Sequence, residues 1–134
     1  DDIEEVAREL KTITEKLNLA GGVRLGVVSF SDVKSGTEYG YRSLDLNGDF
    51  TEVGAFLDDI DLVGSVEDIY GAVWKTVDEF SWQSKTKRMI VVSGDEEPAI
   101  GRETNYTEAD VFSKCKSMQV AANLYPVLID KNEK

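Results

Sequence analysis

Asp45, Asn47 and Asp49 alternate along the chain in the way that the first ligands of a calcium-binding loop do. Calcium takes oxygen ligands, and the helix–loop–helix calcium site draws them from alternate loop positions. That loop also requires a glycine next and a glutamate at its twelfth position, where this chain has Phe50 and Phe56. The required pattern fails, so we interpret the segment as a turn that leads into a helix.

A second group of carboxylates is the run Asp95-Glu96-Glu97. Glycosidases use two carboxyl groups on separate elements, one on each side of the sugar, and neighbours in one loop do not establish that geometry. The chain contains no His, which excludes a Ser-His-Asp or Cys-His centre. Its single Cys115 lies in an amphipathic stretch and is expected to be a small buried residue rather than a nucleophile. We therefore expect no enzymatic activity, and the alternative is a Mg²⁺-dependent hydrolase.

Composition indicates one globular domain spanning residues 1–134. Hydrophobic residues make up 41% of the chain and its net charge is -11. Nucleic acid binding needs clustered Lys and Arg, so this acidity argues against a nucleic acid partner. The chain has no apolar run of membrane-spanning length, so we expect no membrane insertion.

Hydrophobic periodicity predicts helices alternating with strands. Apolar residues spaced by three and four predict a helix over 3–17, with Ile3, Val6, Leu10, Ile13 and Leu17 on its buried face. Nearly unbroken apolar runs predict strands at 23–30 and 89–92 that are covered on both faces. The remaining predicted elements are strands at 39–46 and 124–129 and helices at 53–60, 65–80 and 107–118. This order predicts a doubly wound α/β fold with a mostly parallel sheet between helical layers.

The ends of the helices carry capping signals. Asp49 or Thr51 is expected to cap the second helix, and Thr107 with Asp110 has the capping-box spacing before the last one. Ser65 is expected to cap the third helix, whose buried face includes Val73 and Val77. Phe112, Cys115 and Met118 form the apolar stripe of the last helix, and Trp74 and Trp82 are expected to be packing residues.

Three segments of the chain resemble the von Willebrand factor A domain family. Val23–Asp32 resembles the second strand of that family, Val66–Val73 the helix after its second metal loop, and Met89–Pro98 its fourth strand with the acidic loop that follows. The matches extend through most of the chain in the family's order. The resemblance implies a three-layer α/β fold and a role in binding other proteins.

One part of the family pattern is missing. Members begin with a central strand that ends in an Asp-x-Ser-x-Ser motif, whereas Asp1–Val6 resembles the helix that follows it. We therefore expect that the sequence lacks this strand and that its sheet has two unpaired edges, which are an aggregation hazard. A segment from the same chain or from another chain is expected to fill the gap.

The resemblance also implies a divalent cation site. The family's second metal position corresponds to Glu67, and its third corresponds to Asp95. With Ser65 and water, these carboxylates would hold Mg²⁺ or Ca²⁺, which prefer oxygen ligands, and a carboxylate of the partner would complete the shell. The alternative is that Glu67 and Asp95 are ordinary loop acids and that Ser65 only caps a helix.

The partner is expected to be another protein, bound in adhesion or assembly. Its contacts would lie on the strand-end face, in the loops that contain Asp32, Glu96, Glu97 and Tyr106. A third interpretation is a metal-free structural domain of a larger polypeptide, in which Glu67 blocks cation binding. Common use of the family implies an exported or cell-surface location.

Overall fold

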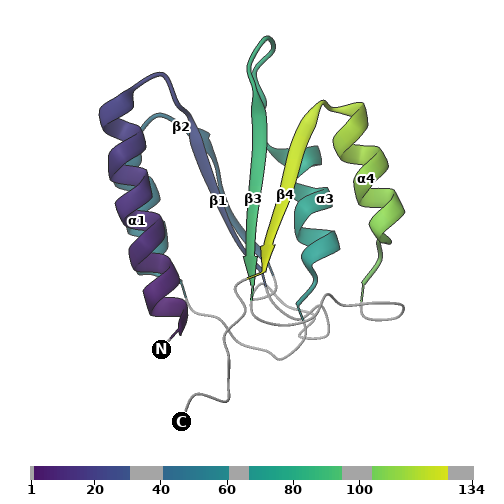
Figure 1. Cartoon of the computed structure of the whole chain (residues 1–134), viewed down its shortest axis with the longest axis horizontal. Coiled ribbons are helices and arrows are strands. Elements are labelled where there is room, and N and C mark those ends of the chain that lie inside the picture. Colours follow the sequence, from purple (N-terminus) through teal and green to yellow (C-terminus); the bar gives the residue numbers. More distant parts are fainter. Residues whose placement is uncertain (1, 31–40, 61–66, 95–103, 127–134) are drawn as a thin grey trace.

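Helices and strands follow one another in a computed structural model of the chain, which describes residues 2–30, 41–60, 67–94 and 104–126. The helices are α1 (Asp2–Ala20), α2 (Phe50–Asp58), α3 (Ile69–Glu79) and α4 (Glu108–Ser117). The strands are β1 (Leu25–Phe30), β2 (Tyr41–Asn47), β3 (Arg88–Gly94) and β4 (Val120–Pro126). Figure 1 shows α1 and α2 beside β1 and β2, and α3 and α4 beside β3 and β4.

The strands form two separate pairs, so the predicted fold class is wrong. β1 pairs with β2 in antiparallel orientation, β3 pairs with β4 in parallel orientation, and no ladder within the described residues joins the pairs. Ten residues, 31–40, separate β1 from β2, fewer than the dozen or more that a parallel crossover needs, so the pair is antiparallel. The parallel pair β3 and β4 is connected through a helix, α4. The chain is therefore not a doubly wound, mostly parallel sheet between helical layers.

The main core lies between α3, α4, β3 and β4. It contains Ile69, Val73, Val77, Val92, Cys115 and Val120, each nearly inaccessible to solvent. Phe30 of β1 packs against the same cluster, so α3 supports a strand of each sheet. Cys115 is buried as expected, and burial raises the pKa of its thiol. A smaller buried patch on α2 contains Val53 and Leu57.

Two of the three predicted helix starts are confirmed. The Asp49 carboxylate accepts a hydrogen bond from the Thr51 amide at the start of α2. Thr107 and Asp110 form the expected capping box of α4. The third prediction is wrong, because α3 begins at Ile69 and its N-cap is Asp68, not Ser65. The Asp68 carboxylate accepts a hydrogen bond of 2.9 Å from the Gly71 amide. This cap sets the first residue of α3, although the apolar spacing predicted a helix that begins earlier, at residue 65.

Of the predicted buried face of α1, the structure describes the side chains of Leu10, Ile13 and Leu17, and only Leu10 and Leu17 are half-buried. Thr14 is buried and donates its hydroxyl hydrogen to the Leu10 carbonyl oxygen at 2.7 Å. Ile13, which the periodicity placed on the buried face, is 50% exposed. α1 packs mainly against α2, where Lys11 pairs with Asp58, and a neighbouring helix covers a narrower stripe than a sheet does.

Two other sequence-based expectations need correction. β4 begins at Val120, four positions before the predicted start at Leu124, because Val120 to Asn123 extend the ladder with β3. Phe112 on α4 is 68% exposed, although its spacing from Cys115 predicted a shared buried face. Trp82 does pack against the core, and its indole nitrogen donates to the Val77 carbonyl oxygen at 3.1 Å.

Replacing Val77 and Val91 by alanine compares the same chemical change at a buried and an exposed position. Val77 is fully buried on α3, whereas Val91 on β3 is 58% exposed. We expect Val77→Ala to lower the free energy of unfolding by about 2 kcal/mol, because it leaves a cavity in the core. Val91→Ala should change it by less than about 0.5 kcal/mol. Urea unfolding measures both, and equal losses would contradict the packing described.

Candidate binding surface on strand β3

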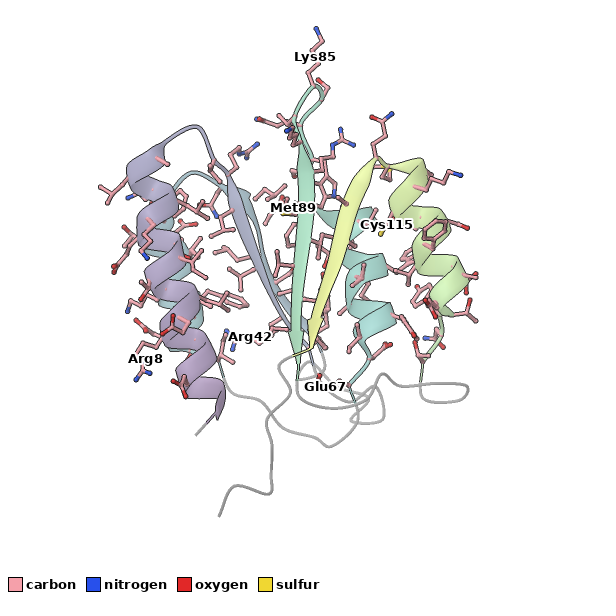
Figure 2. All side chains as sticks on the ribbon, in the orientation of Figure 1. Arg8, Arg42, Glu67, Lys85, Met89 and Cys115 are labelled. Atoms are coloured by element: carbon pink, nitrogen blue, oxygen red, sulfur yellow. The ribbon has the colours of Figure 1, made fainter. Side chains whose placement is uncertain are left out.

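Most of the residues predicted to hold a cation or a partner lie outside the described part of the chain. These are Asp32, Ser65, Asp95, Glu96 and Glu97. Glu67 is described: it is half-buried, and its carbonyl oxygen accepts a hydrogen bond of 2.9 Å from the Ile69 amide. Figure 2 shows it near the carboxyl ends of β3 and β4, the end where the prediction placed the site. No group of three potential metal ligands occurs among the described residues, so the Mg²⁺ or Ca²⁺ site stays a prediction.

Tyr106, the other described residue of the predicted site, lies against an aromatic neighbour. Its ring stacks on that of Trp74, with 4.8 Å between centroids and 14° between planes. The Lys114 ammonium lies 4.4 Å from the centroid of the Trp74 ring and 2.6 Å from an Asp78 carboxylate oxygen. These contacts hold Tyr106, in the loop before α4, and Lys114 of α4 against α3. A role of Tyr106 in partner binding stays a prediction.

The interpretation of the calcium-like segment as a turn is only partly right: Asp45 and Asn47 lie at the end of β2, and only Gly48 and Asp49 separate the strand from α2. The side chains of this segment make hydrogen bonds within the chain. The Asn47 side-chain oxygen accepts from the Asp49 amide at 2.8 Å. The Asp45 carboxylate accepts from the Ser81 amide at 2.8 Å and from the Ser81 hydroxyl at 2.5 Å. Asp45 therefore fastens the end of β2 to the segment that follows α3.

These hydrogen bonds set the ionisation of Asp45. Partial burial raises the pKa of its carboxyl, but hydrogen bonds from Ser81 and from the Leu46 amide, together with the charge of Arg24, outweigh that effect. The net result is a pKa below the ordinary aspartate value. The carboxylate is held in its charged form by the contacts that a bound cation would have to replace.

The clearest unexplained surface lies on β3, at residues that sequence analysis assigned to the interior. Met89 is 61% exposed and Val91 is 58% exposed, whereas Ile90 and Val92 face the core. Successive side chains of a strand point to opposite faces, so helices cover one apolar face of β3 and leave the other open. Figure 2 shows Met89 on this strand. The prediction that residues 89–92 are covered on both faces is wrong.

The two backbone edges of β3 differ in their pairing among the described residues. Its ladder joins it to β4, and within the described residues no ladder lies on its other side. β1 is likewise paired only with β2, and Figure 1 shows β1 on the side of β3 away from β4, running in the same direction. An unpaired strand edge presents a row of N–H and C=O groups that another extended segment can pair with.

Basic residues stand at the start of the same strand. Lys85 and Lys87 are exposed, and neither forms an ion pair or hydrogen bond with another described residue. Figure 2 shows Lys85 at the tip of the turn before β3, where its backbone has a φ of 60°. Arg88 is occupied: its guanidinium donates to the carbonyl oxygens of Gln83 and Met118. These bonds hold the turn to the start of β4.

One signal in the sequence marks this surface. No acidic residue occurs from Ser81 to Gly94, although the chain as a whole carries 26 of them. The stretch therefore differs in charge from the rest of the chain and coincides with β3 and the turn before it. Apolar runs alone cannot reveal the surface, because a strand with one open face has the same sequence pattern as one buried on both.

Comparison with models of known protein families, with curated proteins and with solved structures finds no match to this chain. The resemblance to the von Willebrand factor A family stays a prediction from the sequence. Among the helices that the structure describes, none has the length and apolar character needed to cross a membrane.

Replacing Asp45 by asparagine tests the role of its carboxylate. Because its pKa is lower in the folded protein, the stability that it provides is present above the ordinary value of 3.8 and is lost as pH falls below it. We expect Asp45→Asn to cost about 1 kcal/mol at pH 7 and progressively less below that value. Urea unfolding as a function of pH measures the difference.

Asp58→Asn is the matched control, because its exposed carboxylate pairs with Lys11 across the surface. An exposed ion pair contributes little to the free energy of unfolding, so Asp58→Asn should lower that free energy by less than about 1 kcal/mol at pH 7. If Asp45→Asn lowered the free energy of unfolding by the same amount at every pH from 7 to 2, the charged form of the Asp45 carboxylate would not be what stabilises the fold.

Proposed function

We propose that this chain is a protein-binding module and that it binds its partner through the β3 surface, defined as Met89, Val91, the unpaired edge of β3 and the two lysines Lys85 and Lys87. The observation that carries the proposal is the exposure of Met89 and Val91 beside that edge. Apolar side chains gathered next to an open edge are typical of an interaction site.

The energetics favour an interface at this position. Covering the side chain of a Met or Val provides about 1.5–3 kcal/mol when it becomes fully buried, and both residues are more than half exposed in the free chain. Lys87 directly precedes β3 and Lys85 lies at the tip of the turn before it, and charges outside an apolar centre tend to affect the rate of encounter more than the affinity. The chain as a whole carries a net charge of -11, which repels an acidic partner at long range, so Lys85 and Lys87 would attract one only at short range.

Charge substitutions on the exposed face test the proposal. We expect Met89→Lys and Val91→Lys to weaken partner binding at least about tenfold, because each places a charge in the apolar centre of the interface. The 134-residue chain would be immobilised, exposed to a native cell extract, and scored by quantitative mass spectrometry for proteins that the wild type retains and the variants lose.

Phe112→Lys is the matched control, because Phe112 is an apolar residue of similar exposure on α4, away from the β3 surface. It should retain the same proteins as the wild type, and all three variants should unfold at similar temperatures. The proposal would be contradicted if the β3 variants retained the same proteins as the wild type. It would also be contradicted if Phe112→Lys lost the same proteins as the β3 variants.

A further inference from the structure

We infer that the β3 surface binds an extended segment of the partner protein, which adds to β3 as a strand and carries acidic residues at the end beside Lys85 and Lys87. This inference rests on the proposed function and narrows it to a recognition mode and a partner chemistry. Three properties of β3 support it: its backbone edge, its exposed face and the charge at its start.

The backbone edge specifies an extended conformation. In a strand, the N–H and C=O of one residue point to the same side, so alternate residues of β3 bond to β4 and the others point away from it. β3 is seven residues long, which is enough for a continuous ladder with a second segment. A helix or a folded surface cannot satisfy such a row of groups, whereas strand addition to an open edge does.

The exposed face specifies apolar side chains at alternate positions of the added segment. Met89 and Val91 are two positions apart and therefore point to the same side of the sheet. Side chains of an adjacent strand on that face lie within contact distance of them. A segment with β-branched or other apolar residues at every second position would cover both, and would be covered by them.

The charge at the start of β3 specifies the acidic end. Lys85 and Lys87 are exposed in a stretch without acids, so they repel a basic segment and attract an acidic one. Lysines near a strand edge also discourage unspecific pairing with the edges of other sheets, because their charge is left unpaired. An acidic segment would pair with that charge and could therefore bind where other segments do not. Arg88 takes no part, because its guanidinium is bound to backbone carbonyl oxygens of the chain itself.

Synthetic peptides test the inference directly. The probes alternate Val and Thr over seven residues, the length of β3, and carry two Asp at one end. One control has Pro at its centre, a second is N-methylated at alternate residues, and a third carries Lys in place of Asp. Fluorescence anisotropy measures binding to the 134-residue chain, and amide chemical shifts locate the bound peptide.

We expect the acidic peptide to bind to β3 and the Pro and N-methylated peptides to bind at least about tenfold more weakly, because they cannot form the ladder. The Lys peptide should bind about three- to tenfold more weakly, and Lys85→Gly with Lys87→Ser should remove that difference. Gly tolerates the positive φ at position 85, so this variant changes charge without straining the turn.

Equal binding of the acidic, Pro and N-methylated peptides would overturn strand addition. If strand addition fails in this way but Met89→Lys still abolishes partner binding in the extract, the proposed function stands without the strand-addition mode. If Met89→Lys leaves partner binding in the extract unchanged, the proposed function and the strand-addition mode are both wrong. Concentration-dependent self-association of the wild type that Met89→Lys abolishes, measured by sedimentation, would make a second copy of this chain the occupant and would overturn a heterologous partner segment.

Discussion

The packing of α3 is the interaction on which the rest of the structure depends. Its buried face, which includes Val73 and Val77, contacts the inner side of β3 and β4, and Phe30 of β1 packs against the same cluster. Asp68 caps its first turn, and the Trp82 indole donates to carbonyl oxygens of its last turn. One helix thereby supports a strand from each of two sheets that share no hydrogen-bonded ladder within the described residues. The helix fixes which face of β3 is buried, and the opposite face follows as the open one.

An apolar face beside a strand edge that no described residue pairs with is a costly arrangement. Exposed Met and Val side chains lose the favourable burial that the rest of the core obtains, and unpaired edges invite aggregation. The basic residues at the start of β3 oppose unspecific pairing, and under the proposed function they would also favour an acidic segment. The apolar face and the strand edge that make β3 a hazard in isolation are the features that, under the proposed function, would accept an extended partner segment.

The sequence predicted single elements better than their arrangement. Alternating spacings of three and four located α1 and α3, and local side-chain chemistry located the caps at Asp49 and Thr107. Pairing and coverage depend on contacts between distant segments, which periodicity does not contain. The run at 89–92 has the same pattern whether one or both of its faces are covered, so Met89 and Val91 were assigned to the interior. Of the predicted cation and partner site, the described residues contain only Glu67 and Tyr106.

Amide hydrogen exchange along β3 in the free chain tests the central claim most directly, because it needs no partner. The structure predicts alternation: the amides that bond to β4 should exchange slowly, and those that point to the open edge should exchange at least about tenfold faster. Two-dimensional NMR resolves the residues from Arg88 to Gly94 one by one. Slow exchange at every residue of the strand would show that the edge is already paired or covered, and would contradict the account of β3 as an acceptor.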